Sequence, residues 1–136
     1  MAVLEFASYR VKNMDYQRNE KYKISDEKIV MNPQISREIN VDKNRIYVTL
    51  NVVVGSIADE KSPFQVTCSV IGTFDYRPKE DGAETGLDQL VRVNAVAILY
   101  PYVRSIITML TATSNEYPSY IMPTINVSKV LASQEK

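Results

Sequence analysis

The segment that most constrains the fold runs from Arg45 to Ile57, where apolar residues alternate strictly along the chain. One set of alternate positions is entirely aliphatic: Ile46, Val48, Leu50, Val52 and Val54. The other set is mixed: Tyr47, Thr49, Asn51 and Val53. A period of two places successive side chains on opposite faces of a β-strand, whereas a helix would scatter both sets around its surface. The segment is therefore predicted to be a strand with one buried face.

Three further segments have strand patterns, separated by turn signals. Leu4 to Tyr16 alternates, but its phase reverses near Ala7-Ser8, which indicates a β-bulge or a change of face. Gln34 to Val41 alternates weakly, and Phe64 to Tyr76 is rich in β-branched and aromatic residues. Gly72, within the last segment, predicts a bulge or a close backbone approach. Four strands joined by short turns after the first connection favour an antiparallel sheet.

The connection from Gln17 to Pro33 is polar and has no clear period. A short apolar run, Ile29 to Met31, precedes the turn signal Asn32-Pro33, and we expect a short strand there within a long crossover loop. Long loops in compact domains are often functional, so a solvated connection and a functional loop are both open.

Pro101 is expected to begin a helix, because proline lacks the N–H that a first helical residue does not use. The apolar residues that follow have helical spacing: Val103, Ile106, Ile107 and Leu110. Asn115 can take the left-handed conformation that ends a helix. A shorter helix over Leu87 to Asn94 leads towards Pro101, where a kink or break is predicted. A short amphipathic helix is predicted over Ser128 to Lys136.

After the long helix, two X-Pro pairs impose an extended backbone, because a residue before proline avoids the α region. Five apolar side chains lie on this stiff linker: Tyr117, Tyr120, Ile121, Met122 and Ile125. They either pack on the core of the same domain or form a binding surface, since exposed apolar patches mark such surfaces. Three residues of the crossover loop are weaker candidates for the same surface: Tyr22, Ile24 and Met31.

The composition limits the function as much as the fold. The 136 residues suit a single domain, 1–136, and 16 basic residues balance 16 acidic ones, so no basic excess indicates a nucleic-acid partner. The absence of histidine removes the usual general base and the commonest metal ligand. No phosphate-binding loop, cysteine pair or nucleophile elbow is present. We therefore expect neither an enzyme nor a bound cofactor or metal.

Cys68 is the only cysteine, and its place in an apolar strand predicts a small buried residue rather than a nucleophile. A chain without an internal disulfide suits a reducing cytosol. The N-terminus lacks the basic and apolar regions of a signal peptide. The longest apolar run, Ala95 to Val103, is far shorter than the roughly 20 residues that a membrane helix needs. The expectation is a soluble cytoplasmic protein without membrane insertion.

The strands come first along the chain and the helices last, which is typical of an α+β domain. The expected architecture is a four-stranded antiparallel sheet with C-terminal helices packed on one face. Two short helices are not expected to cover the whole aliphatic row from Ile46 to Val54 together with Val53. Unprotected sheet edges also favour pairing with another chain. A homo-oligomer, at least a dimer, is therefore predicted.

Three motifs in the second half resemble the SecB family of bacterial export chaperones. Residues 98–104, ILYPYVR, resemble the family's ILFPYAR; Tyr117-Pro118 resembles its Phe-Pro; and residues 123–127, PTINV, resemble its Pro-x-Val-Asn-Phe. Residues 12–17 also resemble the family's first-strand segment Lys-Asp-Ile-Ser-Phe-Glu. The resemblance implies four antiparallel strands followed by two helices, and a tetramer built from paired dimers. It also implies an ATP-independent holdase that binds unfolded or precursor polypeptides.

Flexible methionine and amphipathic tyrosine suit a surface that accepts many client sequences. Nine tyrosines and five methionines supply this chemistry. The alternative is a structural or assembly protein that uses the same fold only to form an oligomer.

The resemblance also implies that acidic residues on the sheet dock the translocase motor SecA. The matching positions hold Asn13, Gln17 and Thr67, which are uncharged, and only Asp15 lies nearby as a carboxylate. Weak or absent SecA binding is therefore predicted. The net charge is also zero, whereas the resemblance would imply an acidic protein. These uncharged positions raise an alternative, which is a SecB-like chaperone dedicated to a toxin–antitoxin partner.

Overall fold

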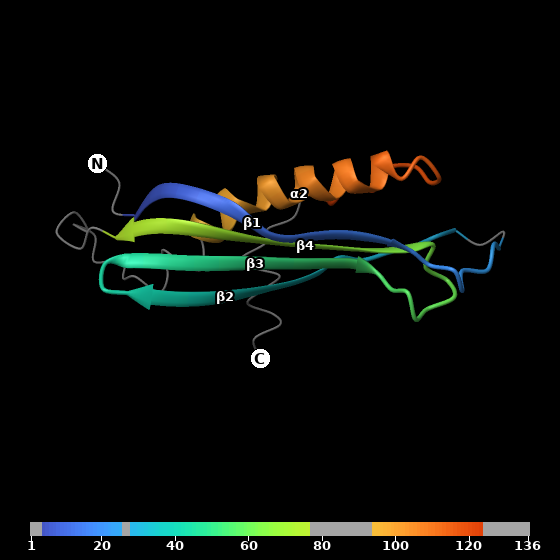
Figure 1. Cartoon of the computed structure of the whole chain (residues 1–136), viewed down its shortest axis with the longest axis horizontal. Coiled ribbons are helices and arrows are strands. Elements are labelled where there is room, and N and C mark those ends of the chain that lie inside the picture. The colour runs from blue at the N-terminus through green and yellow to red at the C-terminus, as the bar shows by residue number, and fades with distance from the viewer. Residues whose placement is uncertain (1–3, 26–27, 77–93, 124–136) are drawn as a thin grey trace.

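A computed structural model of the chain describes residues 4–25, 28–76 and 94–123 (Figure 1). The elements are β1 (Leu4–Arg18), β2 (Gln34–Asp42), β3 (Arg45–Gly55), β4 (Phe64–Tyr76) and α2 (Val96–Thr113). The strands form one antiparallel sheet in the order β1-β4-β3-β2, so β1 and β2 are its edges. The predicted α+β architecture is confirmed. The helices predicted over 87–94 and 128–136 lie outside the described residues, apart from Asn94.

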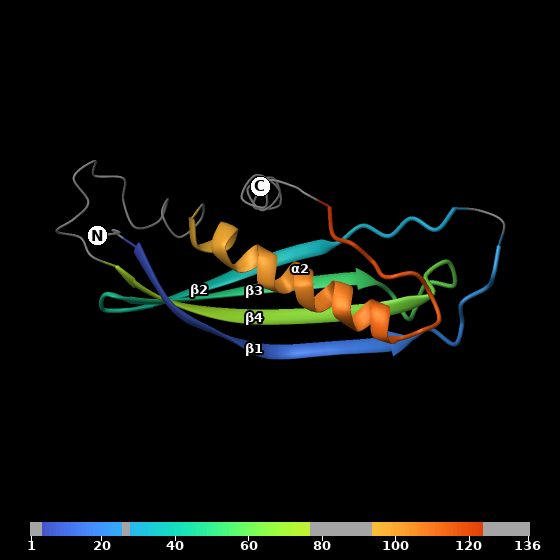
Figure 2. The same ribbon diagram turned by 90° about the horizontal axis from the view of Figure 1, so that it is seen from above.

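α2 covers one face of the sheet, which we call the inner face, and lies obliquely above β3 and β4 (Figure 2). Its buried residues recur at helical spacing: Val96, Leu99, Tyr100, Val103, Ile107 and Thr111. The predicted apolar stripe is confirmed: Val103 and Ile107 are buried, and the half-buried Ile106 and Leu110 pack against the same core. These last two flank the fully buried residues.

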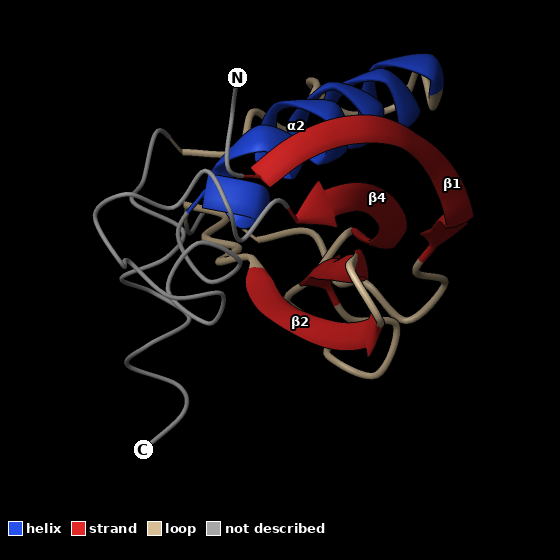
Figure 3. Ribbon diagram, turned by 90° about the vertical axis from the view of Figure 1, so that its left-hand side faces the viewer, coloured by secondary structure: helices blue, strands red, loops and turns tan. Residues whose placement is uncertain are grey.

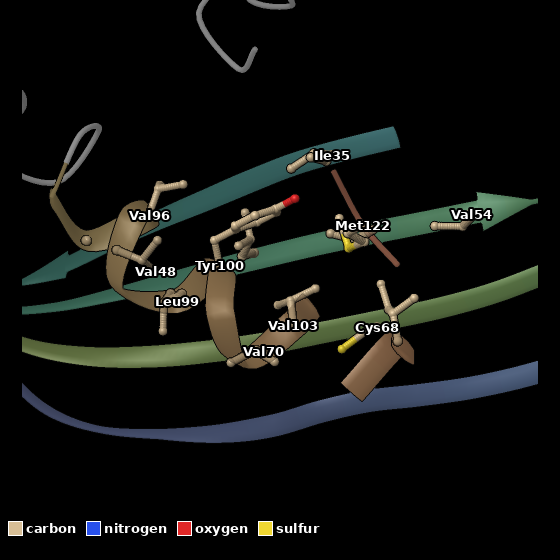
Figure 4. Packing of buried hydrophobic residues seen from close by; sticks show 14 of the residues in the cluster. Ile35, Val48, Val54, Cys68, Val70, Val96, Leu99, Tyr100, Val103 and Met122 are labelled. Carbon is tan, nitrogen blue, oxygen red and sulfur yellow. The ribbon is translucent and has the colours of Figure 1, made fainter. Parts of the chain in front are cut away.

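The aliphatic row of β3 is buried within one chain. Ile46, Val48, Leu50 and Val54 have no exposed surface, and Val52 is 1% exposed. They pack with alternate residues of β4, residues of α2 and Met122 in one core (Figure 4). The expectation that this row exceeds the available cover was wrong for the row itself, because α2 has 18 residues and the segment after it also packs on the sheet. Val53, which was part of the same expectation, is only half-buried and lies on the opposite face of the sheet.

β1 contains two register shifts, and both keep its apolar side chains on the inner face. The predicted phase change near Ala7-Ser8 is a register shift between Phe6 and Ser8, and a second shift lies between Val11 and Asn13. The inner-face residues of β1 are consequently Leu4, Phe6, Tyr9, Val11, Met14, Tyr16 and Arg18. β-Bulges increase local twist, and β1 curls strongly around the end of the sheet (Figure 3).

α2 runs continuously through Pro101, so the predictions of a helix start and of a break at this residue were wrong. Proline removes the hydrogen bond to the carbonyl four residues earlier. Here both Pro101 and Ala97 are exposed, so water can satisfy the Ala97 carbonyl. The predicted left-handed residue after the helix is confirmed, since Asn115 has a φ of 58°.

At Gly72 a side chain of α2 lies very close to the β4 backbone. A Cβ atom at this position would lie 2.7 Å from Leu99 Cδ2 and 2.9 Å from Phe74 Cε1. The register of β4 continues through Gly72 without a shift, so the close approach expected from the sequence is made by the Leu99 side chain and no bulge is present.

Residues 29–31 do not form the predicted strand. The pairing of β2 begins at Gln34, opposite Val53, so an extension back to residue 31 would pass the end of β3. β3 ends at Gly55, whose φ of 79° turns the chain away. The segment therefore has no strand to pair with.

Candidate client-binding surface

The structure brings the crossover loop, residues 19–33, next to the linker that follows α2, residues 114–123. Both lie at the end of the sheet where β1 ends (Figure 2). The rings of Tyr22 and Tyr117 meet edge to face at 6.1 Å between centroids. Tyr120 Oη donates a hydrogen bond of 3.0 Å to the Met31 carbonyl. Four of the predicted surface residues, two from each segment, are therefore in contact.

Asn19 holds the start of the crossover loop in place. Its side chain is buried and donates hydrogen bonds to the carbonyls of Asp59, at 2.8 Å, and Ser62, at 2.7 Å. Its backbone N–H bonds to the Pro63 carbonyl, and its own carbonyl accepts the Tyr22 N–H. Asn19 thus fixes Tyr22 relative to the β3–β4 turn. This role could not be predicted from the sequence, because the loop has no hydrophobic periodicity.

The linker is held on α2 by hydrogen bonds along an extended backbone. The Tyr120 N–H bonds to Thr111 Oγ1 at 2.8 Å, and Thr108 Oγ1 donates to the Tyr120 carbonyl at 3.2 Å. Tyr100 Oη donates to the Pro123 carbonyl at 2.6 Å. Burial raises the pKa of the Tyr120 hydroxyl, so this group remains a hydrogen-bond donor at neutral pH.

Several apolar side chains of these two segments are exposed to solvent. Ile24 is 90% exposed and Ile121 is 63% exposed. Ile29 and Val30, which were predicted only as part of a short strand, are also exposed. An exposed group of apolar side chains on irregular backbone usually marks a binding surface.

Met122 has no exposed surface and belongs to the core, where it lies over β3 (Figure 4). The expectation that it is accessible was wrong, and the alternative of packing on the domain's own core applies to it. In an extended segment neighbouring side chains point to opposite sides, so Ile121 points out where Met122 points in. Ile125 lies outside the described residues.

An aromatic cluster connects these segments to the sheet. Phe64, which is buried, lies 5.3 Å from Tyr16 and 6.0 Å from Tyr117 between ring centroids. Tyr117 in turn contacts Tyr22, and its pKa is raised chiefly by burial. We call Tyr16, Tyr22, Phe64 and Tyr117 the aromatic cluster. No local sequence pattern indicates it, because its members come from four different elements: β1, the crossover loop, β4 and the linker.

A second exposed apolar group, on β1 and α2, was also missed. Tyr9, Val11 and Met14 are exposed on the inner face of β1, and Met109 is exposed on α2. Tyr9 stacks on Tyr102 of α2 at 4.1 Å. We call these residues the edge patch. Its sequence signal was the alternation of Tyr9 and Val11 between the two register shifts of β1, continued by Met14 after the second shift.

The opposite face of the sheet, the outer face, is largely polar. Asp15 pairs with Thr67, and the register places Asn13 and Gln17 on the same face on either side of Asp15. The Gln17 side chain donates a hydrogen bond of 2.8 Å to Asp15 Oδ2. The predicted docking positions therefore do lie together, with a single carboxylate among them.

A metal site, a reactive thiol and a small-molecule cavity would each require a particular arrangement among the described residues. No group of three metal-ligating side chains occurs among those residues. Cys68 is buried, and burial raises its pKa to about 11, so the thiolate nucleophile is disfavoured. A cavity of about 160 Å³ lies beside Tyr22, and an open hollow of about 470 Å³ lies beside Gln34 and Val53. The first is smaller than the roughly 300–1,000 Å³ of typical small-molecule sites, and the second is within that range.

By length and composition alone, α2 could cross a membrane. Its apolar face packs on the sheet, which is the ordinary situation of a core helix.

Comparison with known proteins decides the family. The model of the family described as preprotein translocase subunit SecB matches residues 3–136. The chain belongs to the SecB family. An uncharacterized protein of Methanocaldococcus jannaschii is 35% identical over 140 residues, which is 98% of this chain and 85% of that protein.

A solved structure has the same fold as this SecB family member. It is the SecB-like chaperone Rv1957 of Mycobacterium tuberculosis in complex with a ChAD peptide from the antitoxin HigA1. It is 14% identical, with a TM-score of 0.70 and 90% of each chain covered. The recognition of the family from its sequence motifs is therefore confirmed, and the family indicates a chaperone-type role.

The opposite burial of two adjacent linker residues gives a direct test of this surface. Met122→Ala is expected to lower the free energy of unfolding by about 2–5 kcal/mol, because it leaves a cavity in the core. Ile121→Ala is expected to change it by less than about 0.5 kcal/mol, as exposed substitutions do. Urea unfolding of both variants checks this. Equal costs at the two positions would contradict the described path of the linker.

Proposed function

We propose that this protein is an ATP-independent cytoplasmic holdase that binds unfolded polypeptide segments on the surface made by the crossover loop and the linker. The observation that carries the proposal is the meeting of these two segments, with Ile24 and Ile121 exposed beside Tyr22, Tyr117 and Tyr120. Apolar side chains supply affinity that does not depend on client sequence. Half-buried tyrosines add large contact area with a polar end.

A client segment is expected to use this surface without any energy source. Binding removes exposed apolar area from water, which is favourable in itself. The hydrogen bonds at Asn19 and Tyr120 hold the two segments in place beforehand, so little ordering is needed when a client binds.

Replacing Ile24 and Ile121 together by serine should weaken client binding about tenfold or more and leave the unfolding midpoint nearly unchanged, because both side chains are exposed. The control is Val41→Ser, which removes another exposed aliphatic side chain, 53% exposed, near the β2–β3 turn. The measurement is light scattering from an aggregating client without nucleotide, with affinity from client titration.

A native protein that fails to suppress aggregation would favour the alternative of a purely structural oligomer. Equal losses in the double variant and in Val41→Ser would show that clients bind elsewhere.

A dedicated antitoxin client is the second candidate. The similar Mycobacterium tuberculosis chaperone is bound to an antitoxin peptide in its structure. Asn13, Gln17 and Thr67 are uncharged at the positions expected to dock SecA, which argues against an export role. Recovery of partners from the native host distinguishes one dominant client from many.

We propose further that the protein is a homo-oligomer, a dimer at least and a tetramer if it follows the family's behaviour, and that the edge patch is the contact between copies. The patch joins an unpaired sheet edge to an exposed side of α2, and Met14 is 52% exposed at its centre. An exposed edge strand with apolar side chains favours pairing with another chain.

Met14→Glu should dissociate the oligomer into monomers at micromolar concentration, because a carboxylate would be buried without a partner. Ile121→Glu is the control and should leave the oligomer intact, since it lies on the linker. Sedimentation velocity measures both. A native protein that sediments as a monomer would contradict the proposal.

We also propose that the outer face binds SecA weakly or not at all. Exposed ion pairs contribute only about 0–1 kcal/mol each, so several carboxylates are needed for docking through charge. Asp15 is the sole carboxylate beside Asn13, Gln17 and Thr67, and it already accepts a hydrogen bond from Gln17. Changing these three residues to Asp, Glu and Glu should strengthen binding in a salt-dependent way. Tight, salt-insensitive binding by the native protein would refute this.

A further inference from the structure

The end of β1 is tied to the linker by charge. Arg18 Nε lies 2.7 and 2.8 Å from the two carboxylate oxygens of Glu116, and Arg18 Nη1 lies 2.7 Å from Glu20 Oε2. Hydrogen bonds between charged partners are stronger than those between neutral ones. Arg18 in turn holds the pKa of Glu116 below its ordinary value. Of these two contacts, only the one to Glu116 joins segments distant in sequence.

This ion pair lies directly beside the aromatic cluster. Arg18 pairs with Phe64 in the sheet, and Glu116 precedes Tyr117. Tyr117 packs on both Phe64 and Tyr22. The position of Tyr117 over Phe64 therefore depends on where Arg18 holds the start of the linker.

The aromatic cluster, as it is packed in this structure, also contains an unfavourable feature. Tyr16 Oη is buried and has no hydrogen-bond partner among the described residues. A buried hydroxyl without a partner opposes folding, because it has lost its bonds to water. Opening the cluster would let water reach this group. The closed arrangement thus balances a favourable ion pair and aromatic packing against a buried hydroxyl.

We propose that Arg18 and Glu116 form a latch that positions Tyr117 and sets how much of the aromatic cluster is exposed. Closing the latch covers Phe64 and Tyr16, and releasing it adds their apolar area to the surface that receives unfolded clients. The link to clients rests on the proposed holdase function. The latch itself does not, and it can be measured without a client.

Neutralising the latch should increase binding of an apolar fluorescent dye by about two- to fivefold, the range expected for an exposed ion pair. The variants are Glu116→Gln and Arg18→Gln, and their double variant should bind no more dye than either single one. Amide hydrogen exchange at Tyr117 should quicken by a similar factor. Tyr16→Phe should act in the opposite direction and lower dye binding, because it removes the unpaired hydroxyl.

The chain offers a closely matched control. The Arg45–Asp75 pair joins β3 and β4 at 3.1 Å, with side chains 52% and 35% exposed, against 53% and 37% for Arg18 and Glu116. Asp75→Asn removes the same charge far from the cluster and should leave dye binding unchanged. Equal effects of Glu116→Gln and Asp75→Asn on dye binding and exchange would overturn the latch.

Client affinity is then measured on the same variants. If client affinity and dye binding both increase in Glu116→Gln, the result supports both the latch and the client surface. A rise in dye binding and exchange without a rise in client affinity supports the latch and shows that clients bind elsewhere, which counts against the proposed function alone.

Discussion

Packing of α2 and Met122 on the aliphatic row of β3 is the interaction on which the rest of the structure depends. The row is buried within one chain, and Gly72 lets Leu99 approach β4 closely enough for the helix to lie flat on the sheet. Met122 extends this core beyond the end of α2 and so fixes the linker. Once Met122 is buried, Ile121 must face outward and Tyr120 must face the crossover loop, because the prolines keep this backbone extended.

The proposed client surface is therefore a consequence of the core. Asn19 fixes the loop from one side, Met122 and Thr111 fix the linker from the other, and the two meet at Tyr22–Tyr117 and Met31–Tyr120. The polar outer face and the edge patch are separate surfaces with different chemistry, which suits separate partners.

Strand alternation and the proline motifs predicted most of the fold, since both act locally. β4 was predicted to the residue, and the first register shift of β1 was read from its phase. The second shift could have been found in the same way from Met14 and Tyr16. The helix start and break predicted at Pro101 were wrong, because its exposed position within α2 depends on tertiary packing. Met122 and Ile121 are both apolar neighbours in an extended segment, so only the position of the core distinguishes them. Asn19, the aromatic cluster and the Arg18–Glu116 pair join distant segments and leave no local pattern.

The most direct test of the central claim is amide hydrogen exchange with and without a bound unfolded client. Slower exchange is expected in both the crossover loop, around Tyr22 to Met31, and the linker, around Tyr117 to Met122, with the outer face unchanged. Protection confined to the outer face around Asn13 and Thr67, or to one of the two segments alone, would contradict a client surface built where the loop and the linker meet.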